Sequence, residues 1–254
     1  MKKSFLNIAK VMMPFGLAFG MIACTTTEDG TPVESESRVA LRATADQNAD
    51  GENSRVDVGA MSVTEFQVGT QDVEMRYAAK SEIGAGINLG NISLSTNLNA
   101  ELGTSASQPK SNLLIQNGEH QTAVIGEGRT PDGTYTEITF DLYQNTNVEQ
   151  DHFAYGKSLY IIGEVNNTPT RIWFETEEEL RATSRDTGGY AIDGDADLWL
   201  YFDLQSMFNG VDFSAATDAD ADGFIDIGPN DVDGNGDIHA AIRANLDSSV
   251  EFVK

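Results

Sequence analysis

The chain has 254 residues, and its 40 acidic against 16 basic side chains give it a formal net charge of −24 at pH 7. A charge this negative repels nucleic acid and anionic membrane surfaces, so we exclude nucleic acid as a partner. Cys24 is the one cysteine, which excludes a disulfide within the chain and leaves the fold to be held by its core and by any metal that it binds.

The N-terminal residues predict export. Lys2 and Lys3 precede an apolar stretch at residues 11–22, which has the length of the apolar part of a secretory signal peptide and is too short to span a bilayer. The stretch ends in Met21-Ile22-Ala23-Cys24, which resembles the lipobox of bacterial lipoproteins. The resemblance implies a signal peptide at residues 1–23, cleavage before Cys24 and acylation of that cysteine. It therefore implies an outer-membrane lipoprotein of the bacterial cell envelope, facing the periplasm or exposed at the cell surface.

The rest of the chain divides into a tether and one domain. Residues 24–37 are polar and acidic and show no apolar periodicity, which is typical of a flexible tether. From residue 38 to residue 254 there is no fixed-period repeat and no linker rich in Pro, Gly or Ser. We therefore expect a single domain at residues 38–254.

Alternation of apolar and polar residues predicts that this domain is mainly β. Strands are expected at residues 39–41, 61–77 (two strands or one bent strand), 83–98 (a pair), 134–143, 158–165, 170–175 and 197–204. In the last of these, Leu198, Leu200 and Phe202 share one face while Trp199 and Tyr201 share the other. Many short strands separated by turns favour an antiparallel β-sandwich.

Few helices are expected. Residues 177–183 are interpreted as one or two helical turns, and residues 204–209 as one more. The best candidate is residues 238–246, near the C-terminus, where Ile238, Ala241, Ile242 and Leu246 fall on one face.

Three strands together resemble a known class of domain. They are the short first strand, the strand opened by Gly133-Thr134-Tyr135 and the late strand Leu-Trp-Leu-Tyr-Phe-Asp-Leu at residues 198–204. They are similar to the transthyretin-like and immunoglobulin-like β-sandwich domains of unknown function in bacterial surface lipoproteins. The resemblance covers residues 38–254, implies fold and location, and brings no catalytic residues with it.

An acidic loop at residues 217–237 carries the most informative chemistry. Asp218, Asp220, Asp222 and Gly223 reproduce D-x-D-x-D-G, the first half of an EF-hand-like calcium loop, in which a tight turn brings alternate carboxylates to one point. The backbone carbonyl of Phe224 and the carboxylate of Asp226 occupy two further ligand positions. The twelfth position holds Pro229 in place of the usual acid, so Asp231 or Asp233 is expected to close the site.

A second half-motif follows at once. Asp231, Asp233, Asn235 and Asp237 repeat the ligand spacing, but the twelfth position is Ile242. Two incomplete loops in tandem resemble the calcium loops of thrombospondin-type repeats, in which successive acidic segments share ions. Asp237 is also a candidate N-cap for the helix that follows.

Two other acidic segments are further candidates. Asp46, Asn48 and Asp50, with Asp57 at the twelfth position, resemble the dockerin version of the loop; an exposed turn is the alternative interpretation. Asp193, Asp195 and Asp197 alternate before a strand and are interpreted as a turn leading into it, with metal binding as the alternative.

Calcium is the metal that these residues favour. Seven Asp within the 20 residues from Asp218 to Asp237 repel one another unless a cation neutralises them. A ligand set made only of oxygen disfavours zinc and copper. The alternative is a solvated acidic loop that binds no metal.

No catalytic constellation is present, so we expect no enzymatic activity. His120, His152 and His239 lack the spacing of a metal or triad motif, and no G-x-S-x-G or phosphate-binding loop occurs. Carboxylates are abundant, which leaves a carboxylate-dependent hydrolase as a second alternative. The aromatic residues that could form a sugar-stacking face, or simply pack in strands, are Tyr190, Trp173, Trp199 and Tyr201.

The sequence thus supports three functional hypotheses. The first is a lipid-anchored extracytoplasmic binding or structural module that is stabilised by Ca²⁺, held on the membrane through acylated Cys24, and partnered by a glycan or a surface protein. The second is a carbohydrate-binding or adhesive surface lipoprotein in which calcium is incidental. The third is the hydrolase.

Overall fold

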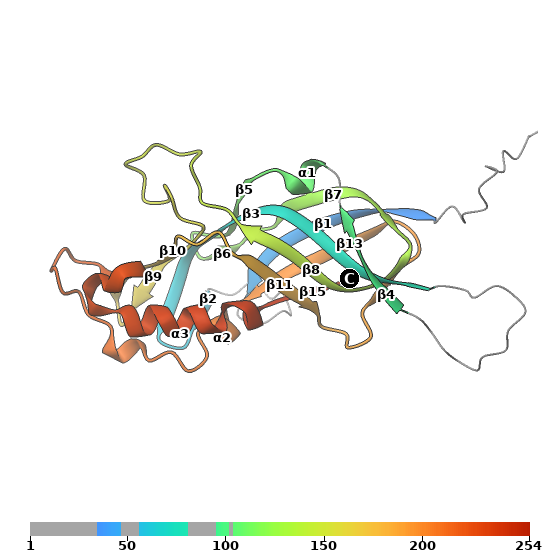
Figure 1. Ribbon diagram of the computed structural model, residues 1–254. Helices are drawn as coiled ribbons and strands as arrows, with labels where there is room; N and C mark the ends of the chain where they lie inside the picture. Colours follow the sequence, from blue (N-terminus) through green and yellow to red (C-terminus); the bar gives the residue numbers. More distant parts are fainter. Residues whose placement is uncertain (1–34, 47–55, 81–94, 102–103) are drawn as a thin grey trace, which may run out of the picture. The chain divides into compact units, whose positions relative to one another are not determined.

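Strands make up most of the residues that the computed structural model describes, which are 35–46, 56–80, 95–101 and 104–254 (Figure 1). Cys24, Asn48 and Asp50 lie outside these residues, as does the expected strand pair at residues 83–98 up to residue 94. The strands are β1 (Glu36–Asp46), β2 (Val56–Val58), β3 (Met61–Lys80), β4 (Ser95–Glu101), β5 (Lys110–Gln116), β6 (Glu119–His120), β7 (Ala123–Pro131), β8 (Gly133–Leu142), β9 (Leu159–Val165), β10 (Thr168–Phe174), β11 (Glu179–Ser184), β12 (Tyr190–Ile192), β13 (Ala196–Asp203), β14 (Ile225–Ile227) and β15 (Val250–Val253).

The helices of the described residues are short except for the last. They are α1 (Thr104–Ser107), α2 (Leu204–Met207) and α3 (Gly236–Leu246), with 3₁₀ segments η1 (Phe213–Ala215), η2 (Pro229–Gly234) and η3 (Asp247–Ser249). The prediction of a mainly β protein whose last helix lies near the C-terminus is confirmed. β1 already includes Glu36 and Ser37, which were expected in the tether.

All of these strands belong to one mixed sheet. Its main path runs β14-β10-β9-β3-β8-β11-β15-β13-β1-β7, and β2, β4, β5, β6 and β12 pair to the side of this path. Three pairs are parallel: β1 with β13, β10 with β14, and β11 with β15. The antiparallel sandwich is therefore not confirmed. Alternation along a strand fixes which residues face the core, but it carries no information about the direction of the neighbouring strand.

The long strand β3 organises this sheet. Its first part, to Val68, pairs with β9, and its second part, from Thr70, pairs with β8. Between them lies Gly69, where a Cβ atom would sit 1.9 Å from the backbone oxygen of Tyr143. Only glycine permits so close an approach of the two backbones. β3 can therefore pass from β9 to β8 as one bent strand. This is one of the two alternatives that its sequence predicts.

The sheet curls back on itself. β5 pairs with β3 in the middle of the path, and it also lies against β7 at the end of the path. The Gln121 N–H donates to the Leu114 carbonyl over 2.8 Å, and Lys110 Nζ donates to the Ile125 carbonyl over 3.0 Å. The inward side chains of the sheet therefore surround a single core.

The alternation predicted for the late strand is confirmed in this core. Leu198, Leu200 and Phe202 on β13 are fully buried, and the Phe202 ring lies edge-on to Phe66 and Phe140, with ring centroids 5.6 Å and 6.1 Å apart. Aromatic pairs in this geometry add to the stabilisation that burial of the rings provides. The opposite face of β13 is thereby turned outward.

Two of the three predicted helices are present. α2 begins after Asp203, whose carboxylate accepts from the N–H groups of Gln205 and Ser206, and α3 buries Ile238, Ile242 and Leu246 as its periodicity predicts. The helical interpretation of residues 177–183 is wrong, because residues 179–184 form β11 between β8 and β15. The ladder to β8 and the burial of alternate residues outweigh the helical propensity of the glutamates.

Candidate metal centre

The acidic loop is anchored to one edge of the sheet. Within it, β14 runs parallel to β10, in the register Thr170 to Ile225 and Ile172 to Ile227. Ile225 and Ile227 are buried. α3 follows the loop and contacts β14 (Figure 1). The position of the loop is therefore coupled to the packing of the last helix.

The structure brings Asp218, Asp220 and Asp222 together. One carboxylate oxygen of each lies within 4.8 Å of the other two. Backbone N–H groups hold the turn: that of Asp222 donates to Asp220 over 3.0 Å, and that of Gly223 donates to Asp218 over 3.0 Å. Gly223 has a φ of +91°, so the glycine is used as the motif requires.

Like charges in this cluster repel one another. The hydrogen bond from the Asp222 N–H lowers the pKa of the Asp220 carboxyl, but desolvation and repulsion by Asp222, Asp233 and Asp218 outweigh it and raise the pKa above its usual value. Asp233, which the sequence offers as a closing ligand, is one of the carboxylates whose charge raises the pKa of Asp220. A cation bound here would relieve the repulsion.

Asp226, expected at the ninth ligand position, is held by an arginine. Arg171 Nε donates to Asp226 Oδ1 over 2.6 Å and its Nη2 to Oδ2 over 2.7 Å, while the same Nη2 lies 3.1 Å from Asp222 Oδ2. The guanidinium also lies 4.0 Å from the ring centroid of Phe224. Arg171 thus supplies a fixed cation beside the Asp218–Asp222 cluster.

Sequence reasoning missed Arg171. It lies on β10, far from the loop in the chain, and its only sequence signal is a position on the outward face of a predicted strand. That β10 pairs with β14, with Arg171 directly opposite Asp226, is a fact of the sheet register.

The second half-motif ties the loop together. Asp231 Oδ1 accepts from the Gly236 N–H over 2.8 Å, and Asp233 Oδ2 accepts from the Asp226 N–H over 2.9 Å. The buried amide of Asn235 donates to the carbonyls of Thr217 and Asp226 over 2.8 Å and 2.9 Å. In the part of the chain that the structure describes, these residues do not join the three-carboxylate cluster.

The assignment of Asp237 as the N-cap of the last helix is wrong. The cap position is Asn235, and Asp237 is an exposed residue of the first turn. Because the Asn235 side chain is used to close the loop, it makes no capping hydrogen bond. A carboxylate in the first turn remains favourable, since it lies at the positive end of the helix dipole.

The other predicted loop is only partly described. Asp46 ends β1 and Asp57 lies on the short strand β2, while Asn48 and Asp50 fall among the residues that are not described. That loop stays a prediction.

The four aromatic candidates do not form one face. Trp173 packs edge-on against Phe153, with ring centroids 5.8 Å apart, and lies so close to Gly228 that a Cβ there would be 2.3 Å from its ring. Tyr190 packs against Phe252. Trp199 and Tyr201 share the outward side of β13.

The three histidines make separate local contacts. His120 Nδ1 lies 2.6 Å from the Ala45 carbonyl, His152 Nδ1 accepts from the Ala154 N–H, and His239 stacks on Phe174. Burial lowers the pKa of His239, although its hydrogen bond to the Trp173 carbonyl opposes that shift. None of the three belongs to the carboxylate cluster.

No known protein family, no curated protein and no solved structure matches the chain. Among the described residues, no helix combines the length and the apolar character that crossing a bilayer requires.

Proposed function

We propose that the chain is a lipid-anchored extracytoplasmic module, without enzymatic activity, whose C-terminal acidic loop is stabilised by Ca²⁺. The observation that carries the calcium part is the convergence of Asp218, Asp220 and Asp222 within 4.8 Å of one another. Three carboxylate oxygens form a hard donor set, and hard cations such as Ca²⁺ take such ligands.

Calcium suits this site better than magnesium. Ca²⁺ accepts irregular coordination by six to eight oxygens, whereas Mg²⁺ demands near-ideal octahedral geometry and keeps much of its water. The cluster lies at the surface, with Asp220 and Asp222 exposed, so water can complete the shell. Asp233 and the Phe224 carbonyl are the expected further ligands.

The proposed role of the ion is to order the loop and fix the last helix. The cluster precedes β14, and Asn235 connects Thr217 before the cluster to the start of α3. Neutralising the three carboxylates would favour the compact loop and thereby the docked position of α3. The ion would stabilise an existing fold, because most of the core residues lie outside the loop.

The anchoring part of the proposal rests on the lipobox-like sequence that ends at Cys24. An acylated cysteine would hold the domain on the outer membrane, at its periplasmic or surface face, where a glycan or a surface protein is the expected partner. Extracellular calcium modules bind with Kd values of about 10⁻⁴ to 10⁻³ M, which suits the calcium levels outside the cytoplasm.

Removal of calcium is expected to lower the thermal stability of the purified full-length chain. At free calcium about ten times Kd the gain is about 1.4 kcal/mol, which corresponds to a rise in Tm of about 3–6 °C for a domain of this size. The measurement is thermal unfolding in millimolar CaCl₂, in MgCl₂ and in EDTA. The rise should be specific to calcium.

Two variants make this experiment specific. Asp220→Ala combined with Asp222→Ala should remove the calcium-dependent rise. Glu177→Ala combined with Glu179→Ala removes the same charge from an exposed acidic segment outside the loop and should leave the rise intact. Equal Tm values for the unaltered chain in calcium and in EDTA would show that the loop binds no calcium.

A further inference from the structure

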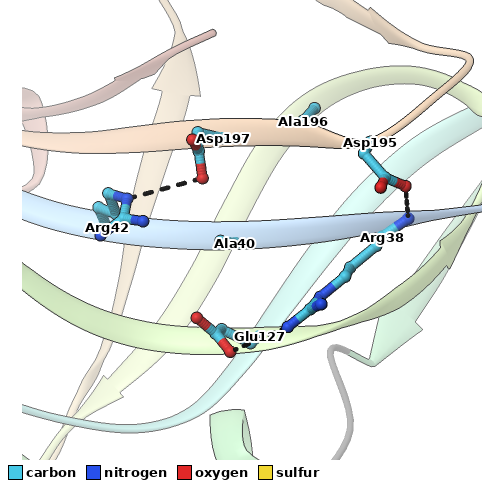
Figure 2. Close-up of a pocket in the computed structure, with 7 residues that line it drawn as sticks. All are labelled: Arg38, Ala40, Arg42, Glu127, Asp195, Ala196 and Asp197. Carbon is cyan, nitrogen blue, oxygen red and sulfur yellow. Dashed lines mark hydrogen bonds and ion pairs between the residues drawn. The ribbon is translucent and has the colours of Figure 1, made fainter.

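A hollow of about 300 Å³ lies on the outward side of β13, β1 and β7. Figure 2 shows the three strands side by side, with Ala40 between Arg38 and Arg42 on β1, Asp197 on β13 and Glu127 on β7. The hollow lies on a different group of strands from the acidic loop. It combines donors of positive charge with acceptors of negative charge on one small surface.

The strand register explains the hollow. Ala40 lies opposite Asp197 on one neighbouring strand and opposite Glu127 on the other. Its neighbours Val39 and Leu41 are fully buried, so Ala40 faces outward. A methyl group surrounded by long charged side chains leaves an apolar floor with a polar rim.

The ion pairs of the rim are long. The Arg38–Glu127 pair is separated by 3.7 Å and the Arg42–Asp197 pair by 3.6 Å, both beyond hydrogen-bond length. By contrast, the Arg171–Asp226 contact measures 2.6 Å. The rim pairs are exposed, so their mutual attraction is weak. The guanidinium of Arg42 and the carboxylate of Asp197 can therefore turn to a ligand at little cost.

An aromatic ring adjoins this rim. Trp199 lies opposite Arg42 in the register of β1 and β13 and is partly exposed. The guanidinium carbon of Arg42 is 6.0 Å from the Trp199 ring centroid, at the limit of a cation–π contact. A ligand that displaces Arg42 slightly would gain access to the face of the indole.

The charges of the hollow select the class of ligand. Two arginines face three carboxylates, since Asp195 also lines the hollow and accepts from the Arg38 backbone N–H over 3.2 Å. A net negative rim on a chain of charge −24 disfavours anions, while the arginines disfavour cations. A neutral ligand with many hydroxyl groups can bind both the arginines and the carboxylates of the rim, because each hydroxyl donates and accepts hydrogen bonds.

We propose that this hollow binds a neutral carbohydrate. Hydroxyl groups of the sugar would donate to Asp197 and accept from Arg42 and Arg38. The C–H face of the sugar ring would lie on Ala40 and against Trp199. A volume of about 300 Å³ is at the lower end of the range for small-ligand sites, which suits one sugar unit of a chain. This site is independent of the calcium loop.

The test uses the full-length chain in a detergent without a sugar headgroup. The probes are four neutral oligosaccharides, maltohexaose, cellohexaose, xylohexaose and mannohexaose, and one anionic oligosaccharide, the hexamer of galacturonic acid. Binding is measured by isothermal titration calorimetry. It is also followed by fluorescence in Trp173→Phe, which leaves Trp199 as the one tryptophan. At least one neutral probe should bind and change the Trp199 emission.

Variants connect that binding to the hollow. Arg42→Ala and Asp197→Ala should each weaken the binding at least tenfold, and Ala40→Leu, which fills the floor and keeps the charged rim, should abolish it. Arg181→Ala, an exposed arginine of β11 outside the hollow, is the matched control and should bind as the unaltered chain does. Thermal unfolding of each variant shows that it is folded.

Three results would overturn the proposal. The first is the absence of binding by every neutral probe. The second is binding of the galacturonic acid hexamer alone, which would mean that the arginines select an anion. The third is binding that persists in folded Ala40→Leu, which would place the sugar elsewhere on the chain.

Discussion

Replacing Arg171 with alanine is expected to lower the free energy of unfolding by about 2–3 kcal/mol in EDTA. Loss of one partner of a buried ion pair costs about 3–5 kcal/mol. The Arg171 and Asp226 side chains are 22% and 15% exposed to solvent. The expected cost is therefore somewhat smaller than for a fully buried pair. The variant leaves Asp226 without its two hydrogen bonds and Asp222 without its nearest cation. It also removes the packing of the guanidinium on Phe224.

Calcium should compensate for part of this loss. Without Arg171 the acidic loop carries one more uncompensated negative charge, so neutralisation by a bound ion gains more free energy. Denaturant unfolding in EDTA and in millimolar CaCl₂ measures both states. The calcium-dependent increment should be larger in Arg171→Ala than in the unaltered chain. Arg171→Lys, which keeps the charge but loses the two-pronged contact with Asp226, should lie between them.

Arg185→Ala is the matched control for this experiment. Arg185 contacts Glu251 and lies over the Tyr201 ring, so it makes the same kinds of contact as Arg171. Its pair is more exposed, at 37% and 29%, and its partner Glu251 lies outside the acidic loop. Its loss should cost at most about 1 kcal/mol and leave the calcium increment unchanged. Equal increments in Arg171→Ala and the unaltered chain would mean that Arg171 and the loop are not coupled.

Replacing Cys24 with alanine is expected to abolish lipid attachment completely. Acylation of a lipoprotein requires the thiol, and no second cysteine can substitute for it. Growth with an alkyne-labelled palmitate, followed by purification of the chain, measures the modification directly. The unaltered chain should carry the label and partition with membranes, because anchoring by more than one acyl chain is stable.

Two further variants define this result. Cys24→Ser keeps a hydroxyl group in place of the thiol and should also lose the label. Met21→Leu places the residue more typical of a lipobox and should keep it. Label on Cys24→Ala would show that the lipid is attached elsewhere, and no label on the unaltered chain would remove the anchoring part of the proposed function.

Sequence alone predicts those features that depend on nearby residues. The alternation from Leu198 to Phe202 is a property of one strand, and the spacing of Ile238, Ile242 and Leu246 is a property of one helix. The convergence of Asp218 with Asp222 is likewise local, since a turn of five residues and a glycine produce it. Each of these features appears in the structure as its pattern predicts.

Features that depend on strand pairing cannot be predicted from the sequence in this way. The position of Arg171 opposite Asp226, and the two neighbours of Ala40 in the hollow, follow from registers between distant segments. The glutamates before Leu180 favour a helix locally, but pairing on both sides makes the segment a strand. Asn235 closes the loop through hydrogen bonds with Thr217. The sequence around Asn235 does not indicate that Thr217 lies beside it.

The place of β15 in the sheet has a consequence for how the chain folds. β15 is the sole link in the main path between the part that ends at β11 and the part that begins at β13, yet it follows every other strand in the sequence. A chain synthesised from its N-terminus therefore cannot complete the hydrogen-bonded path between these two parts until residues 250–253 have emerged. Until then the edges of β11 and β13 stay open to pairing with other chains, and the many contacts between distant segments make closure slow. Assembly of this sheet depends on its last strand.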